Sequence, residues 1–214
     1  TVPVLAAVLL AVTAGAATPV PVAGAQTGPA TLVDIRAANH TTYDRLVFEF
    51  RGPLPVAHDV RFVSEVTHDA AGFTVPTVGD ARLRVIFSDA VGHDEAGSGT
   101  YGPTRRTFAL PNLMQVNTVG DWEGTLTFGV GLAQAAAFRV STLTAPSRVV
   151  IDIDTPARTV PVRVYFIDDN DQQRPRSVIR PVIPPATSRG ALQRLFAGPT
   201  LAEAAGGLRL VTSA

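Results

Sequence analysis

The feature that most constrains this chain is a repeated alternation of apolar and polar residues between Thr31 and Thr155. Successive side chains of a β-strand point to opposite faces of a sheet, so a period of two gathers the apolar residues on one face. The alternating segments are 46–50, 60–62, 83–87, 126–130, 138–140 and 149–153. They predict half-buried strands that each keep one face toward solvent.

Turn residues separate these segments, and none of the segments shows a helical period over ten or more residues. The turn signals are Arg51-Gly52-Pro53, Ala71-Gly72, Val78-Gly79-Asp80, Gly97-Ser98-Gly99 and Val119-Gly120-Asp121. Many short strands without helices between them predict an all-β sandwich or barrel. The stretch from Ala90 to Pro111 alternates least, and we expect a long loop there.

The N-terminal residues have the pattern of a targeting signal. Val2 to Ala17 form an uncharged apolar run, which is short for a membrane span of about 20 residues. Ala23-Gly24-Ala25 fits the small-x-small pattern of signal peptidases, so we expect cleavage before Gln26. The prediction is a signal peptide over 1–25, a linker over 26–30 and no integral membrane span after cleavage. The alternative is that the run stays as an uncleaved anchor.

Composition excludes several classes of function. The 18 basic residues, all Arg, balance 18 acidic residues, and the net charge is zero. Nucleic-acid binding needs a basic face, so no nucleic acid is expected as a partner. There is no cysteine, which excludes disulfides, thiolate metal ligands and a cysteine nucleophile.

The pattern changes after residue 155. Residues 162–166 and 177–185 each predict a strand, with Asp168-Asp169-Asn170-Asp171 as a polar turn between them. This turn lacks the glycine and the distal glutamate of an EF-hand calcium loop. A helix capped at Thr187 or Ser188 is expected to stop at Gly198-Pro199. Thr200 and Glu203 form a capping box for a second helix, and another strand starts at Leu208.

Motifs spread over residues 31–154 resemble the AMIN-like domain of exported actinobacterial proteins. They are Tyr43 to Phe50 with Gly52-Pro53, Thr100-Tyr101, Gly120 to Gly124, Leu126 to Leu132, Phe138 to Val140, and Pro146 to Ile153. The resemblance implies an AMIN-like β-sandwich domain over 31–155 that docks proteins at the envelope, in related cases by contacting peptidoglycan. It brings no catalytic residues and no cofactor, so the chain is predicted not to be an enzyme.

The C-terminal residues resemble the first half of a GerMN domain, another interaction module of exported proteins. The matching residues are Val162 to Asp168, Arg180 to Val182, Ala191 to Leu195, Gly198 to Thr200, Glu203 and Gly207-Leu208. The resemblance implies a small, partial GerMN-like α+β domain over 161–214. A segment with the predicted order ββααβ is small for a domain with a hydrophobic core of its own.

A ligand-binding surface is expected in the loops. Exposed aromatic rings beside Arg stack on sugar rings or clasp carboxylates of a cell-wall peptide. The candidate residues are Tyr101, Arg105, Arg106, Trp122 and Glu123. The preferred interpretation of Trp122 and Tyr101 is nevertheless that they pack under the loop and close one end of the sandwich.

Signals for catalysis are weaker. His93, Asp94 and Glu95 are the best candidates for a loop-borne metal site, but they lack a ligand spacing such as HExxH. Asp152 and Asp154 project to one strand face, where a wet strand edge is the preferred interpretation. Arg45 is expected to pair with a neighbouring acid. We therefore predict no catalytic residues and no metal.

These observations favour an exported, non-catalytic module that localises to the cell envelope, with peptidoglycan or an envelope protein complex as partner. Two alternatives stay open: a loop-based metal-dependent hydrolase, and a purely structural domain that adds a partner strand to a sheet edge.

Overall fold

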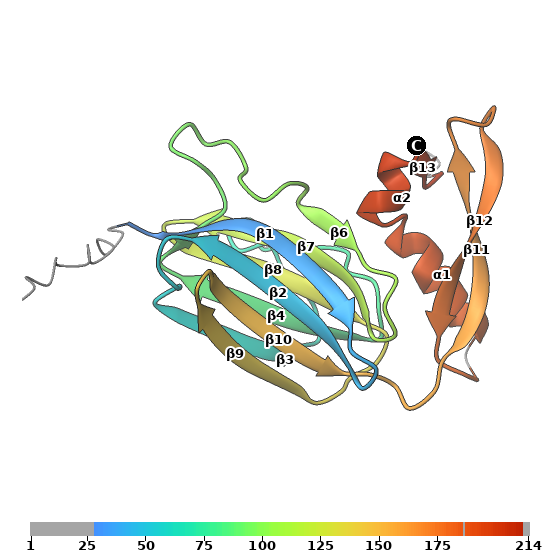
Figure 1. The fold of residues 1–214 in the computed structure, drawn as a ribbon, viewed down its shortest axis with the longest axis horizontal. Helices are drawn as coiled ribbons and strands as arrows, with labels where there is room; N and C mark the ends of the chain where they lie inside the picture. The colour runs from blue at the N-terminus through green and yellow to red at the C-terminus, as the bar shows by residue number, and fades with distance from the viewer. Residues whose placement is uncertain (1–27, 186, 212–214) are drawn as a thin grey trace, which may run out of the picture.

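The computed structural model describes residues 28–185 and 187–211, so the predicted signal peptide lies outside the described residues. The chain forms two parts that lie side by side (Figure 1). Strands β1 to β10 make up residues 30–154, which we call the two-sheet domain. Strands β11 to β13 with two helices make up residues 160–209, which we call the C-terminal module.

The two-sheet domain is built from two five-stranded sheets. The first has the order β5-β1-β2-β10-β9, with β5 parallel to β1 and the other pairs antiparallel. Its strands are β1 (Ala30–Asn39), β2 (Tyr43–Arg51), β5 (Ala90–Val91), β9 (Phe138–Thr144) and β10 (Ser147–Asp154). The second has the antiparallel order β3-β4-β8-β7-β6. Its strands are β3 (Ala57–Val63), β4 (Ala81–Ser88), β6 (Arg105–Thr107), β7 (Leu113–Trp122) and β8 (Thr125–Leu132).

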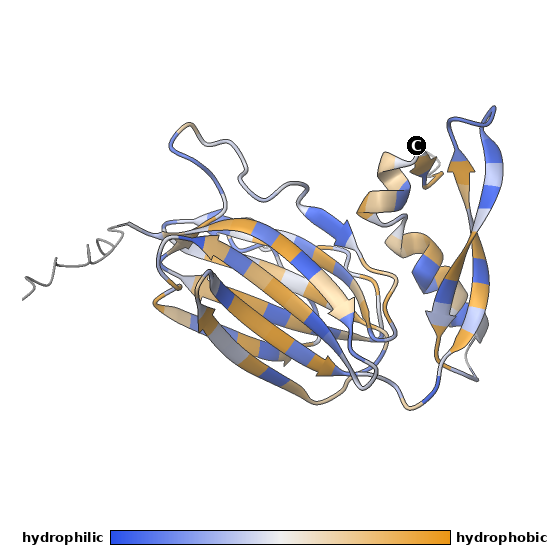
Figure 2. Cartoon of the chain, in the orientation of Figure 1, coloured by the Kyte–Doolittle hydropathy of each residue, from blue (hydrophilic) through white to orange (hydrophobic). Residues whose placement is uncertain are grey.

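The alternation seen in the sequence places one apolar core between the two sheets, and the hydropathy bands along the strands in Figure 2 follow it. Phe48 of the first sheet lies 5.0 Å, centroid to centroid, from both Phe87 and Phe128 of the second. All three rings are fully buried. Offset and edge-to-face aromatic contacts of this kind add to the free energy of burial. The predicted all-β class is confirmed, and all six predicted strand segments fall in strands.

One turn prediction was wrong. Val119, Gly120 and Asp121 lie inside β7, and the hairpin turns at Glu123 and Gly124, which have φ values of +48° and +72°. Gly120 is needed for a different reason, because a Cβ there would overlap the carboxylate of Asp69. The glycine therefore marks a close approach by another segment and not a reversal of the chain.

The C-terminal module is a three-stranded sheet, in the order β12-β11-β13, with two helices packed on one face. Its elements are β11 (Val160–Asp168), β12 (Arg174–Val182), α1 (Thr187–Ala197), α2 (Leu201–Ala205) and β13 (Leu208–Arg209). The predicted turn at 168–171 joins β11 to β12, and the predicted capping box of Thr200 and Glu203 is confirmed. None of the helices in the described ranges is long and apolar enough to cross a membrane.

An ion pair between buried Arg180 and half-buried Glu203 holds α2 on the sheet. Arg180, 2% exposed, donates from Nη1 to Glu203 Oε1 at 2.9 Å and from Nη2 to the other carboxylate oxygen. Partial burial acts to raise the pKa of Glu203, but the hydrogen bonds from Arg180 and Thr200 outweigh it, so the net shift is downward.

This pair predicts acid sensitivity. The folded pKa of Glu203 lies below the unfolded value of about 4.3, so its contribution is fully present above that value and is lost as pH falls through the folded pKa. The free energy of unfolding, measured with denaturant, should therefore fall between about pH 5 and pH 3. It should fall less over the same range in Glu203→Gln. Equal losses in both proteins would contradict this role for Glu203.

Helix α1 docks its C-terminal end on the second sheet. The last carbonyl groups of the helix, at Phe196 and Ala197, accept hydrogen bonds from Arg105 at 2.9 Å and from the Thr107 hydroxyl. Near the start of the helix, Arg189 donates to Asp80 Oδ1 at 2.6 Å. The free carbonyls at a helix C-terminus carry partial negative charge, so an arginine is a favourable partner there.

Candidate functional site

The long loop after β5 and the β7–β8 hairpin enclose an open groove of about 570 Å³ at one end of the two-sheet domain. We call it the loop-end groove. In Figure 1 this loop rises, in green, above the first sheet. Its lining residues are Gly92, His93, Gly97, Gly99, Tyr101, Gly102, Thr104, Thr118, Asp121, Trp122 and Glu123.

The floor of the groove is Tyr101. The ring is only 6% exposed, packs edge-to-face on Phe128 of the core and lies 2.6 Å, oxygen to oxygen, from the Thr118 hydroxyl. Burial raises the pKa of the Tyr101 phenol, so the hydroxyl stays protonated at neutral pH. Tyr101 therefore fixes the base of the loop and offers little surface to a ligand.

The inner wall is formed by Asp121. Its Oδ2 accepts a hydrogen bond from the Gly92 backbone N–H at 3.1 Å and lies 2.8 Å from His93 Nδ1. Its Oδ1 is buried and has no hydrogen-bond partner among the residues that the structure describes. A side chain at Gly92 would overlap the Tyr101 ring and crowd the Asp121 carboxylate, so glycine lets the loop approach this closely.

The rim is formed by Trp122 and Glu123. Trp122 is 71% exposed, although large aromatic side chains are on average well buried. Glu123 follows it in the hairpin turn, at a positive φ of 48°. A free indole face beside carboxylates suits a ligand that has an apolar ring face and hydrogen-bond donors, such as a sugar or a peptide.

The structure brings together three of the five residues that the sequence suggested, namely Tyr101, Trp122 and Glu123. Arg105 instead donates to α1 at Phe196, and burial lowers its pKa. Arg106 is buried under the loop, where it donates to the backbone carbonyls of Ile35 and Tyr101. Neither arginine lines the groove.

The residues suggested for a metal site have separate structural roles. His93 contacts Asp121, while Asp94 Oδ1 accepts the backbone N–H groups of Ala96 and Ser98 at 3.0 and 2.8 Å and so shapes the loop. Within residues 28–185 and 187–211, no group of three or more His, Asp or Glu side chains is arranged to hold a metal ion. A hydrolase centred on His93, Asp94 and Glu95 therefore has no geometric support.

The acidic pair on β10 belongs to the sheet surface. Arg45 makes two hydrogen bonds to Asp152, at 2.7 and 2.8 Å, which confirms the expected pairing of Arg45 with an acid. These bonds lower the pKa of the Asp152 carboxyl. Asp154 pairs with Arg139 at 3.3 Å. Both carboxylates are paired with arginines, as expected for a wet strand face.

Sequence patterns gave no indication that Asp121 faces the groove. It stood in a predicted turn, and its contacts to His93 and Gly92 span 28 and 29 residues of chain. The available signal was Gly124, because glycine is favoured at the second central position of a two-residue hairpin turn. A turn at Glu123 and Gly124 makes β7 longer than predicted, and Asp121 then lies near the end of this strand.

A two-layered all-β domain with a loop-end groove and an exposed aromatic rim has the features of a binding module. The model of the AMIN-like domain matches residues 30–155, more than half of the chain, and the chain belongs to this family. AMIN-like domains are in general non-catalytic and associated with peptidoglycan or the envelope. No curated protein and no solved structure matches the chain. The GerMN-like and actinobacterial assignments stay predictions.

Proposed function

We propose that this protein is an exported, non-catalytic docking module of the cell envelope, and that its loop-end groove binds peptidoglycan. The observation that carries the proposal is the exposed Trp122 on the rim of a groove in a domain of this family. The predicted signal peptide supports export. The GerMN-like module is then a second interaction unit attached to the docking domain.

The lining of the groove supports a carbohydrate or peptide ligand. Trp122 supplies a flat apolar surface, and Glu123 supplies carboxylate acceptors for hydroxyl or amide donors. Gly97, Gly99 and Gly102 line the loop side of the groove without adding side chains to it. A rigid ring against an aromatic side chain loses little conformational entropy, so a single tryptophan contributes much of the affinity.

The test is co-sedimentation of the predicted mature chain, residues 26–214, with purified peptidoglycan sacculi. Saturable pelleting is expected for the wild type, and Trp122→Ala should weaken it by about tenfold or more, as for a central aromatic contact. Tyr101 is unsuitable for this test because its ring belongs to the core.

The matched control is Phe73→Ala. Phe73 is 57% exposed and lies in the 64–80 segment, outside the groove. Its removal should leave pelleting unchanged. If Phe73→Ala and Trp122→Ala behave alike, the groove is not the docking face. If the wild type does not pellet at all, peptidoglycan is not the ligand.

A second candidate function, strand addition by a protein partner, is favoured by β9. In the described residues β9 pairs on one side only, with β10, and it contains neither proline nor glycine. Natural edge strands are usually blocked by such residues or by charges, and β9 carries one charge, Arg139. The variant Thr142→Lys places a charge on this edge and should block strand pairing. An envelope protein that binds the wild type and does not bind this variant would support this function.

A further inference from the structure

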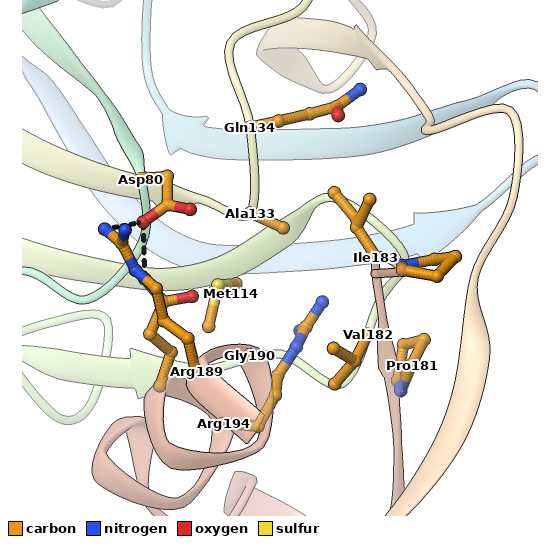
Figure 3. Close-up of a pocket in the computed structure, with 12 residues that line it drawn as sticks. Asp80, Met114, Ala133, Gln134, Pro181, Val182, Ile183, Arg189, Gly190 and Arg194 are labelled. Atoms are coloured by element: carbon orange, nitrogen blue, oxygen red, sulfur yellow. Dashed lines mark hydrogen bonds and ion pairs between the residues drawn. The ribbon is translucent and has the colours of Figure 1, made fainter. Parts of the chain in front are cut away.

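A second cavity, of about 140 Å³, lies between the two-sheet domain and the C-terminal module. We call it the inter-module cavity (Figure 3). Its two sides come from different parts of the chain, with Met114 and Ala133 from the two-sheet domain and Val182 and Ile183 from the end of β12. Gly190 lets α1 approach β12, because a Cβ there would overlap the Val182 side chain.

The feature that sets this cavity apart is Arg194. Its side chain is 2% exposed and reaches from α1 toward the space framed by Met114 and Val182 (Figure 3). Its acceptors among the described residues are two backbone carbonyls, Phe108 O at 3.4 Å and Pro111 O at 3.1 Å. No carboxylate of the described chain lies within ion-pair distance of it. Buried guanidinium groups are normally paired with an acid. Arg194 is therefore unusual, because it is a buried cation without a counter-ion among the described residues.

The electrostatics agree with this geometry. Burial lowers the pKa of Arg194 to about 10, and the Arg180 guanidinium adds to the effect, while Asp44 opposes it. The other charges on the cavity cancel, because Arg189 and Asp80 pair with each other at 2.6 Å. Among the described residues that line the cavity, Arg194 is therefore the charged side chain without an ion-pair partner.

The volume and the lining of the inter-module cavity indicate which class of ligand it can hold. A cavity of about 150 Å³ holds one benzene molecule, so this one admits about six heavy atoms. Apart from Arg194 and the Asp80–Arg189 pair on its rim, the lining has an apolar part, with Met114, Val182 and two prolines, and a polar part with the amides of Gln134 and Gln193. A planar carboxylate matches the fork of a guanidinium, and a short apolar body matches the apolar part of the lining.

We propose that the inter-module cavity is a binding site for a carboxylate with a small apolar body, which pairs with Arg194 and so fastens the C-terminal module to the two-sheet domain. The same chemistry is offered by a free short-chain acid and by the C-terminal carboxylate of a peptide that ends in a small apolar residue. Binding at this site is independent of the loop-end groove.

The test is calorimetric titration of the whole chain with isobutyrate and with its neutral isostere isobutyramide. Isobutyrate should bind saturably with a dissociation constant in the millimolar range, roughly what a ligand of this size allows. Isobutyramide should bind at least about tenfold more weakly, because it lacks the charge-assisted bond to Arg194. A peptide ending in alanine, with a free or an amidated C-terminus, separates the two sources of carboxylate.

Three variants decide the outcome. Arg194→Gln should lose isobutyrate binding by at least about tenfold, and Arg163→Gln, at an exposed position outside the cavity, should not. Ala133→Phe fills the cavity and leaves Arg194 in place, so it decides the question if Arg194→Gln does not fold. Isobutyrate binding that survives in either folded cavity variant, equal binding of the amide, or no binding below about 50 mM would overturn the proposal.

Discussion

Replacing Asp44 with alanine is expected to lower the free energy of unfolding of the two-sheet domain by about 3–4 kcal/mol. Asp44 is 0% exposed, and its Oδ2 accepts the backbone N–H groups of Asn112 and Leu113 at 2.7 and 2.8 Å. Its Oδ1 accepts from Asn39 Nδ2 at 2.9 Å. Alanine would leave two buried N–H groups without acceptors, each at a cost of about 1–3 kcal/mol.

The position of Asp44 makes this loss global. It links β2 of the first sheet to the first residue of β7 in the second, so the carboxylate ties the two layers together at one end. The measurement is denaturant unfolding of wild type, Asp44→Ala and Asp154→Ala. Asp154 has an exposed carboxylate paired with Arg139, so its removal should change stability by less than about 1 kcal/mol. Similar losses in the two variants would show that Asp44 is not a structural tie.

The alternation of apolar and polar residues predicted strands that have one buried face. It failed where both faces of a strand are buried and where a β-bulge interrupts the alternation. In β7, Gln115 and Asn117 are as buried as the apolar residues, because the 64–80 segment and α1 cover the outer face. No alternation is left to detect. In β1, a bulge between Leu32 and Asp34 shifts the register, so that Leu32 and Ile35, three residues apart, both face the core.

The sequence predicted which types of residue could form the candidate site, but not which contacts those residues make. Trp122 and Glu123 could be named as candidates, since aromatic and charged residues in loops often bind ligands. The preferred expectation that Tyr101 and Trp122 pack under the loop was correct for Tyr101, at 6% exposed, and wrong for Trp122, at 71%. Arg105 and Arg106 belong to the same class, yet each is held by a backbone carbonyl that lies tens of residues away in sequence. Arg194 was expected only in a helix, and its burial follows from the docking of α1, which no local pattern encodes.

The same contrast applies to glycine. A local pattern treats each glycine as a turn signal, whereas Gly129 and Gly131 lie within β8. A Cβ at Gly129 would overlap the Val66 side chain, and one at Gly131 would overlap the carbonyl oxygen of Val78. Both neighbours belong to the 64–80 segment, so these glycines create the flat strand surface on which that segment lies.

Gly131→Ala is therefore expected to destabilise the protein by about 2–3 kcal/mol, the cost of forcing an extra methyl group into a packed interface. The atom that it meets is backbone, which has no rotamer to move aside. Relief requires the chain around Val78 to shift, and the Val78 nitrogen lies 3.4 Å from the side-chain amide of Gln115 in β7. The strain should thus reach β7 as well as β8. Denaturant unfolding measures the loss.

Gly99→Ala is the matched control for this prediction. No atom lies within 4 Å of the position that a methyl group at Gly99 would occupy, and the φ of Gly99 is not left-handed. Alanine there should change stability by less than about 0.5 kcal/mol. Amide exchange then separates two responses of Gly131→Ala. If the 64–80 segment lifts off, the N–H of Asp69, bonded to Val119 O of β7 at 3.2 Å, should lose protection ahead of the β8 amides. If both lose protection together, the segment and the sheet unfold as one unit, and the outer layer is part of the core of this domain.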